Sequence, residues 1–288
     1  SPSWELEATF GQDKLERPVS LALDNENRFL YVVDTQAHRL AVFDADTFVF
    51  LRYLGSPSDP LTAEPGTFSY PLSAAVDEEG NVFVADTMND RVQMFDPDGE
   101  FVQMFGRQGI TPGTFMRAKG IAVDRALGKM FWVDSGTGKL QRAGLDGSRV
   151  EDLLTGLTTP LGVAVVPNDG KVYFTDGAFF ARKIRRINPD GTNPEDLITG
   201  LQLPRHLAID RQAGKLYWTD YHEIMRANLD GTGRETVISG LAQPYGIDLD
   251  QPSGKMFWSD LSGIMSANLD GSGVQGVLGW STVQVASD

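Results

Sequence analysis

The stretch Leu216-Tyr217-Trp218-Thr219-Asp220 decides the fold, because this stretch and five variants of it recur along the chain. Each variant is an aliphatic and aromatic run that ends in Asp, and a second aliphatic run precedes it across a short turn. The closing aspartates are Asp34, Asp86, Asp134, Asp176, Asp220 and Asp260. They lie 52, 48, 42, 44 and 40 residues apart. Such a period fits one small antiparallel sheet per repeat and is too long for a leucine-rich or helical-pair repeat.

Each repeat contains four segments with the pattern of short strands, which are named A to D in chain order. The expected first strands are residues 19–23, 72–76, 120–123, 162–165, 206–209 and 246–249. One face of strand A is small, since alanine occupies it in five repeats and Asp248 occupies it in the last. A proline precedes strand A in five repeats, where it needs no ladder partner. Asp-Gly turns such as Asp230-Gly231 accept the positive φ of a tight hairpin and join strands C and D.

Six four-stranded sheets with short loops and no predicted helix indicate an all-β fold, a six-bladed β-propeller of four-stranded antiparallel blades. The small face of strand A suits the place where blades converge on the axis. Residues 4–11 have the pattern of an outermost strand but precede the first strand A, so we expect them to join the last blade and close the ring. The last repeat also has its own outer strand at residues 274–278, so that blade either has five strands or releases the C-terminal tail. We expect residues 1–288 to form a single propeller.

Composition excludes several classes of function. The chain carries 25 Lys or Arg and 39 Asp or Glu, a net charge of −14, which argues against binding a phosphate backbone or an anionic membrane surface. The acidity belongs to residues 1–116, with a net charge of −12, whereas residues 117–288 have a net charge of −2. Hydrophobic residues make up 41% of the chain, enough for a core, and no apolar run is long enough to span a membrane. The absence of cysteine excludes disulfides, thiolate nucleophiles and Cys-ligated zinc.

The repeats resemble two known families. Residues 117–288 are similar to the class B repeats of the LDL receptor, named for Tyr-Trp-Thr-Asp, which Tyr217-Trp218-Thr219-Asp220 matches and Phe257-Trp258-Ser259-Asp260 nearly matches. Residues 1–116 are more similar to NHL repeats, as in Val82-Phe-Val-Ala-Asp86-Thr-Met-Asn-Asp-Arg91. Both families form six-bladed propellers that commonly serve binding, so the resemblance implies a protein or peptide partner and an extracellular or periplasmic location. The change of style near residue 116 fits either natural divergence or an engineered fusion.

The six repeat aspartates offer a ring of carboxylates for a cation, but their position favours a structural role. Each ends the second strand of its repeat, where the carboxylate can accept backbone N–H bonds of the following turn. Sixfold repetition also places the carboxylates far apart around the ring. Asp-Gly strings such as residues 188–193 lack the alternating acids and the final Glu of an EF-hand loop, so turn chemistry explains them.

The three histidines give a weaker indication of a metal centre. His222 does not begin a zinc-protease motif, because Arg226 stands where the second His should be. His206 lies at the start of a first strand, which puts it near the mouth of the central channel, whereas His38 and His222 lie in turns farther out. His206 and Asp248 form an alternative metal site in the channel, where the related propeller lactonases hold calcium. The Glu, Asn and Asp ligand set of that family is not matched, so no cofactor is expected.

The loops before strand A and between strands B and C open on one face of a propeller, around the channel. The residues expected on this face are Lys119, Phe179, Phe180, Arg205, His206, Tyr221, His222, Glu223 and Tyr245. Exposed Tyr and Arg beside a concavity are typical of protein-recognition hot spots. The predicted binding residues are Lys119, Arg205, His206, Tyr221, His222 and Tyr245. The basic run at residues 182–186 is expected to be solvated and to cover apolar neighbours.

Three functions remain open from the sequence. The first is a non-enzymatic module, a monomer that binds a protein or peptide on this loop face, with no nucleic acid and no insertion into a membrane. The second is a metal-dependent hydrolase or lyase with its centre in the channel around His206 and Asp248. The third is an architectural role, or an engineered scaffold without a ligand. No Ser-His-Asp order, nucleophile elbow or phosphate loop favours another chemistry.

Overall fold

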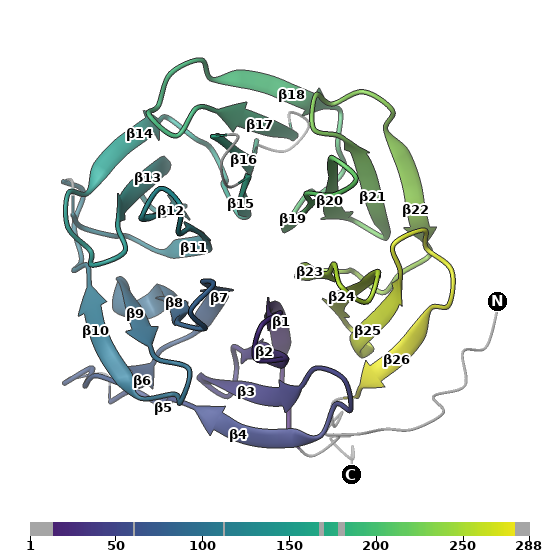
Figure 1. Ribbon diagram of the computed structural model, residues 1–288. Helices are drawn as coiled ribbons and strands as arrows, with labels where there is room; N and C mark the ends of the chain where they lie inside the picture. Colours follow the sequence, from purple (N-terminus) through teal and green to yellow (C-terminus); the bar gives the residue numbers. More distant parts are fainter. Residues whose placement is uncertain (1–13, 60, 112, 167–169, 178–181, 280–288) are drawn as a thin grey trace, which may run out of the picture.

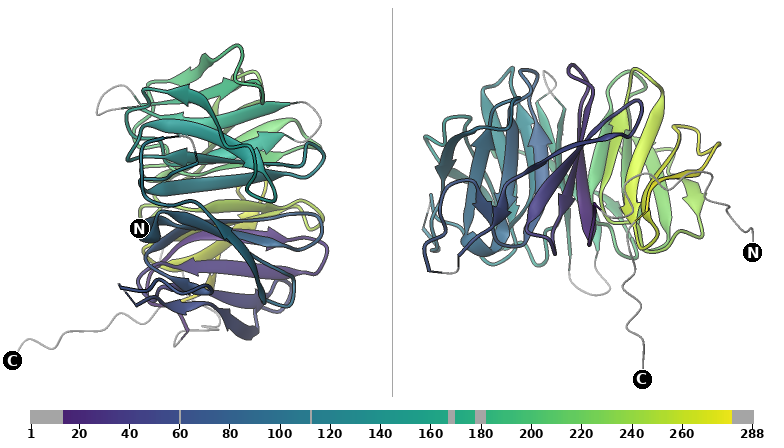
Figure 2. Two further views of the ribbon diagram at one scale, coloured as in Figure 1. Left: turned by 90° about the vertical axis from the view of Figure 1, so that its left-hand side faces the viewer. Right: turned by 90° about the horizontal axis from the view of Figure 1, so that it is seen from below.

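The computed structural model describes residues 14–59, 61–111, 113–166, 170–177 and 182–279. Within them, six four-stranded antiparallel sheets stand around a central axis, with the innermost strand of each sheet nearest the axis (Figure 1). From the side the ring is a thick disc (Figure 2). The helical content of these residues is one 3-10 turn, η1 Thr87–Asn89, and no helix among them is long and apolar enough to cross a membrane. The predicted all-β, six-bladed propeller is confirmed.

Each blade takes its strands from one continuous part of the chain. Blade 1 consists of β1 Pro18–Asp24, β2 Phe29–Asp34, β3 Arg39–Asp44 and β4 Phe50–Leu54. Blade 2 consists of β7 Pro71–Val76, β8 Val82–Asp86, β9 Arg91–Phe95 and β10 Phe101–Phe105. Blade 3 consists of β11 Ala118–Asp124, β12 Lys129–Asp134, β13 Lys139–Gly144 and β14 Glu151–Thr155. Between β4 and β7, the pair β5 Ser56–Pro57 and β6 Thr67–Phe68 is parallel.

The remaining blades follow the same order. Blade 4 consists of β15 Val163–Val166, β16 Lys171–Asp176, β17 Lys183–Ile187 and β18 Glu195–Thr199. Blade 5 consists of β19 Leu207–Asp210, β20 Lys215–Asp220, β21 Glu223–Asn228 and β22 Glu235–Ser239. Blade 6 consists of β23 Ile247–Asp250, β24 Lys255–Asp260, β25 Gly263–Asn268 and β26 Gln275–Leu278. In blades 4 to 6 the first strand begins one residue later than predicted. The reason is that the preceding N–H, as in His206, donates to a side-chain hydroxyl of the second strand (N to Thr219 Oγ1, 3.2 Å).

The two-residue period of a strand turns neighbouring residues of the repeat motif toward different blades. Tyr217 packs toward blade 6 with Trp258, and its hydroxyl donates to Leu269 O at 3.1 Å. Trp218 faces the other way and packs with the apolar side chains of blade 4. The same alternation produces six apolar clusters, one at each interface between neighbouring blades. The core therefore lies between the blades, and the ring depends on every interface being filled.

A hydroxyl near the end of each second strand fastens most blades to the next one. In the C-terminal blades it precedes the closing aspartate, as in Thr219, whose Oγ1 donates to Tyr245 O at 2.7 Å. The hydroxyls of Thr175 and Ser259 make equivalent bonds, to Arg205 O at 3.1 Å and to Val19 O at 3.0 Å. In blades 1 and 2 the hydroxyl follows the aspartate instead. There, Thr35 donates to Pro71 O at 2.6 Å and Thr87 donates to Ala118 O at 2.7 Å.

Blade 3 is the exception, because the position of Thr219 is taken by the buried Val133. The backbone is nevertheless arranged as in the other blades. A Cβ added to Gly120 would lie 2.6 Å from Leu161 O, and one added to Gly162 would lie 2.2 Å from Arg205 O. In these two blades a side chain at the glycine would collide with the backbone of the next blade. Leu161 O of blade 4 is therefore within reach of a hydroxyl at residue 133.

An arginine on the third strand adds a second connection between C-terminal blades. Arg226 donates to Glu235 on its own outer strand at 2.7 Å and to Leu269 O of blade 6 at 3.0 Å. Arg142 and Arg186 occupy the same position and likewise pair with a glutamate of their own blade. The predicted solvated run at residues 182–186 is thus largely paired, since Lys183, Arg185 and Arg186 contact acids of β18.

The ring closes between blades 6 and 1. Phe257 and Ile264 of blade 6 pack with Leu21 and Leu30 of blade 1 in one apolar cluster. Arg28 of blade 1 donates to Asp250 of blade 6 at 2.7 Å, which joins residues 222 positions apart. The last blade contains four strands in the described part of the chain. Residues 4–11, expected to help close the ring, and the tail after residue 279 lie outside the described residues.

Replacing Thr219 with valine tests the hydroxyl connection. The variant leaves the N–H of His206 and the carbonyl of Tyr245 each without this partner, so it should lose about 1–3 kcal/mol of unfolding free energy. Val133→Thr is the matched opposite change. Its new hydroxyl can donate to Leu161 O, so the unfolding free energy should change by less than about 1 kcal/mol. Urea unfolding measures both. If Val133→Thr lost as much unfolding free energy as Thr219→Val, the assignment of Leu161 O as the acceptor for a hydroxyl at residue 133 would be wrong.

Candidate functional site

The loops before each innermost strand and those between the second and third strands share one face, here named the top face. A groove of about 480 Å³ lies on it beside the channel, across blades 1, 2, 3 and 6. Its lining residues are Arg17, Val19, Thr35, Tyr70, Leu72, Thr87, Met88, Arg117, Lys119 and Tyr245. Met88 is 53% exposed and Tyr70 is 49% exposed, and both line this one groove. The groove therefore offers accessible apolar surface bordered by cations.

Tyr245 connects this groove to two other predicted binding residues. The guanidinium carbon of Arg205 lies 4.9 Å from the centre of the Tyr245 ring, and Arg205 Nη1 donates to Gln243 O and Pro244 O at 3.3 and 3.2 Å. The imidazole of His206 lies on the tyrosine as well, with ring centres 5.3 Å apart. Burial raises the pKa of Tyr245, so its hydroxyl stays protonated. Lys119, Arg205, His206 and Tyr245 are thus gathered at the channel mouth.

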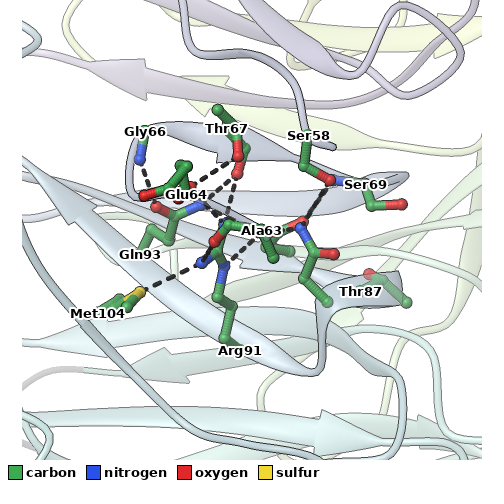
Figure 3. Close-up of polar contacts among 12 residues, drawn as sticks. Ser58, Ala63, Glu64, Gly66, Thr67, Ser69, Thr87, Arg91, Gln93 and Met104 are labelled. Atoms are coloured by element: carbon green, nitrogen blue, oxygen red, sulfur yellow. Dashed lines mark hydrogen bonds and ion pairs between the residues drawn. The ribbon is translucent and has the colours of Figure 1, made fainter. Parts of the chain in front are cut away.

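Tyr70 reaches the groove because a buried arginine holds the preceding loop. Arg91 on β9 donates to the carbonyls of Glu64 and Thr67 at 3.1 and 2.7 Å, as Figure 3 shows. Its Nε pairs with the buried Asp86 at 2.7 Å. Gln93 supports the same loop by donating to Thr67 O at 2.8 Å. The loop ends at Tyr70 with a φ of 47°, a left-handed conformation that the pinned loop maintains.

Burial raises the pKa of Asp86, and the bonds from Ser69 N and from the Asn89 and Arg91 side chains oppose that rise. All three donors belong to this loop network or to the turn after β8. A buried charge pair of this kind depends on both partners, since either alone would be left without compensation. The network therefore links the repeat aspartate of blade 2 to the wall of the groove.

The central channel is a narrower space of about 220 Å³. Burial is the main cause that lowers the pKa of His206 to about 4, and repulsion from the positive charges of Arg205 and Lys119 adds to it. The imidazole is therefore neutral at pH 7. Asp248 accepts from Leu23 N at 2.9 Å and from Leu249 N at 2.8 Å. Burial raises its pKa to about 6 despite those two bonds. Asp248 thus already joins blades 6 and 1, a role that the sequence did not indicate.

The described residues contain no group of three His, Cys, Asp or Glu side chains arranged to hold a metal ion. The repeat aspartates accept backbone N–H bonds, but mostly from the loop before strand A rather than from the following turn as expected. Asp34 accepts from Glu16 N and Arg17 N at 2.9 and 2.7 Å, and Asp176 accepts from Thr158 N at 2.8 Å. These carboxylates organise the top-face loops one by one.

Two predicted residues lie apart from the groove. Tyr221 and His222 stack on each other with ring centres 4.0 Å apart and line a separate pocket of about 240 Å³. Glu223 lines that pocket too. His222 Nδ1 is also 2.8 Å from Leu241 O, so its ring is held by its own blade. The expected Phe179 and Phe180 lie outside the described residues.

The sequence reasoning missed the blade 1 to 3 side of the groove, formed by Arg17, Tyr70, Met88 and Arg117. Arg17 and Arg117 each directly precede a first strand, and Arg205 lies two residues before one. This shared position in the repeat could have identified Arg17 and Arg117 from the sequence. Arg117 also has a φ of 80°, and its N–H donates to Asp90 Oδ1 at 3.0 Å. Such backbone conformations are not visible in the sequence. His38 contacts the groove indirectly, because its Nδ1 accepts from Tyr70 N at 3.2 Å.

Sequence comparisons match parts of the chain. Residues 3–111 match the family described as SMP-30/Gluconolactonase/LRE-like region, and residues 72–178 match a family described as 6-bladed beta-propeller. A segment of 109 residues is 33% identical to the protein brain tumor of Drosophila melanogaster. That segment covers 37% of this chain and 10% of the relative, so the chain corresponds to only a small part of that protein.

Structural comparisons cover most of the chain. A chain of the nidogen/laminin complex aligns with a TM-score of 0.73 and 20% identity, over 86% of this chain and 91% of that chain. A gluconolactonase from Xanthomonas campestris aligns with a TM-score of 0.69 and 16% identity, over 88% of this chain and 86% of that chain. These likenesses confirm the predicted six-bladed propeller fold. The NHL assignment, the division near residue 116 and the single domain over residues 1–288 stay predictions.

The raised pKa of Asp248 predicts a pH effect on stability. Because the folded pKa is about 6 and the ordinary value is 3.8, the folded state binds this proton more tightly than the unfolded state. The contribution of the protonated carboxyl is therefore full below about pH 4 and lost as the pH rises through 6. Asp248→Asn cannot ionise. Its unfolding free energy relative to the unmodified protein should rise by roughly 2–3 kcal/mol from pH 4 to pH 7.

Urea unfolding at several pH values gives this difference directly. A constant difference between the two proteins from pH 4 to pH 7 would contradict the raised pKa.

Proposed function

We propose that the protein is a non-enzymatic module that binds a protein or peptide in the top-face groove. The observation that carries this proposal is the groove of about 480 Å³, in which the exposed Tyr70 and Met88 face the same space as Tyr245 and Lys119. A rigid concavity with accessible apolar and aromatic groups and a cationic border suits an inserted side chain of a partner. The likeness to a chain of the nidogen/laminin complex supports a protein ligand.

The proposal includes the other properties that the sequence indicated. Lys119, Arg205, His206 and Tyr245 belong to the binding surface at the channel mouth. Tyr221 and His222 extend it only if the partner is large enough to reach the outer pocket. We also propose that the protein is a monomer that acts in an extracellular or periplasmic setting.

Selection of peptides from a phage-displayed heptapeptide library on the immobilised protein tests the proposal. The dissociation constants of selected peptides are then measured by fluorescence anisotropy. Met88→Ala and Tyr70→Ala should each weaken binding by roughly fivefold or more, since both remove exposed contact area inside the groove. Thermal unfolding checks that both variants remain folded.

Leu127→Ala is the matched control, because Leu127 is 45% exposed and lies on the opposite face. It should leave the affinities unchanged. Tyr221→Ala, at a site of 45% exposure, reports whether the outer pocket takes part. If the selected peptides bind Met88→Ala and Tyr70→Ala as tightly as the unmodified protein, the groove is not the binding site. If no peptide is selected, an architectural role is favoured.

A metal-dependent hydrolase or lyase is the second candidate, favoured by the match of residues 3–111 and by the gluconolactonase neighbour. Its centre would be the channel around His206 and Asp248. Against it, both carboxylate oxygens of Asp248 already accept backbone N–H bonds. The arrangement therefore leaves few lone pairs for an ion.

Metal content decides between the two candidates. We expect no stoichiometric calcium or zinc after dialysis against metal-free buffer, measured by inductively coupled plasma mass spectrometry. One ion per chain that is lost in His206→Ala, together with hydrolysis of a sugar lactone, would establish the enzymatic alternative.

A further inference from the structure

Three cations, Arg17, Arg117 and Lys119, line the top-face groove, and a fourth, Arg205, lies against Tyr245 beside it. Nine Lys and Arg side chains form ion pairs in the described part of the chain: Arg28, Arg91, Arg125, Lys139, Arg142, Lys183, Arg185, Arg186 and Arg226. Over the same residues, Arg17, Arg117, Lys119 and Arg205 form none. A protein with a net charge of −14 thus leaves these four cations together and unpaired.

The cations also act on one another. Burial, followed by the repulsion of Arg117, lowers the pKa of Lys119. Burial likewise lowers the pKa of Arg205. Placing like charges together in a half-buried site is unfavourable unless an anion joins them, because desolvation and repulsion act in the same direction. The free protein therefore holds a site whose electrostatics an incoming anion would improve.

The backbone of Arg117 and the side chain of Arg205 are held in position. Arg117 has a left-handed backbone, with φ at 80°, and its N–H is bound by Asp90. Arg205 is fixed by two backbone carbonyls and by the Tyr245 ring. Met88 and Leu72 provide apolar surface in the groove that Arg117 and Lys119 line. A ligand that matches must present a carboxylate and an apolar side chain within one short segment.

We propose that the groove recognises an acidic peptide segment of a partner protein, in which an apolar side chain enters beside Met88 while a neighbouring carboxylate pairs with Lys119 and Arg117. This inference rests on the proposed function and adds the chemistry of the ligand. A nucleic acid is the less favourable anion, because a long polyanion is repelled by the net charge of −14 whereas one or two carboxylates respond to the local cations.

The test uses fluorescein-labelled heptapeptides with a central Leu between two Asp residues, and a matched set with Asn in place of Asp. Anisotropy at low and at physiological ionic strength should show roughly tenfold tighter binding of the Asp set, weakening as salt rises. The double variant Lys119→Gln with Arg117→Gln should lose that preference, so that the Asp and Asn sets bind about equally. Lys255→Gln with Arg211→Gln makes the same change in net charge away from the groove and should retain the preference.

Equal binding of the Asp and Asn sets, or equal loss in both double variants, would overturn the inference. Groove binding itself would still stand if peptides from the library depend on Met88, so the two proposals fail separately. A labelled single-stranded RNA octamer is the last comparison. If it binds more tightly than the Asp peptides and loses affinity in the Lys119→Gln with Arg117→Gln variant, the ligand is a nucleic acid and the peptide assignment is wrong.

Discussion

The fastening of each blade to the next is the interaction on which the rest of the structure depends. A four-stranded sheet of this size cannot bury both of its faces alone, so six apolar clusters form only when all the blades are in place. The hydroxyl of Thr219, and its equivalents in every blade except blade 3, connects one blade to the backbone of the next. In blades 4 to 6 the same hydroxyl also accepts the backbone N–H that precedes the first strand. Channel, top face and groove all follow from this arrangement of the blades.

The repeat motif can now be explained residue by residue. Tyr217 and Trp218 fill opposite interfaces because neighbouring strand residues face opposite ways. Thr219 reaches the next blade, and Asp220 caps the loop before strand A at Gln202 N, 3.2 Å away. In the N-terminal blades the hydroxyl moves to the other side of the aspartate, as in Thr87. The two kinds of repeat therefore make the same bond between blades with a hydroxyl on different sides of the aspartate. Blade 3, which lies between them in the chain, has Val133 at the position of Thr219.

The groove lies where the N-terminal blades meet blade 6. Its apolar and aromatic wall depends on a buried ion pair, since Arg91 holds the loop that ends at Tyr70 (Figure 3). Its cationic border depends on loops that precede first strands. The repeat aspartates, which looked like candidates for a metal ring, instead shape these loops by accepting their backbone N–H groups. Structural carboxylates thus place the cations that the ligand would meet.

The sequence by itself determined the all-β class, the number of blades and the position of most strands, because strand alternation and Asp-Gly turns are local signals. It also identified Lys119, Arg205, His206 and Tyr245, which repeat alignment places at the channel mouth. Only the tertiary structure separated Tyr221 and His222 from them and added Tyr70, Met88 and Arg117. Those differences depend on left-handed backbones and a pinned loop, and on which blades meet when the ring closes. Such contacts join residues far apart in the chain, so no local pattern records them.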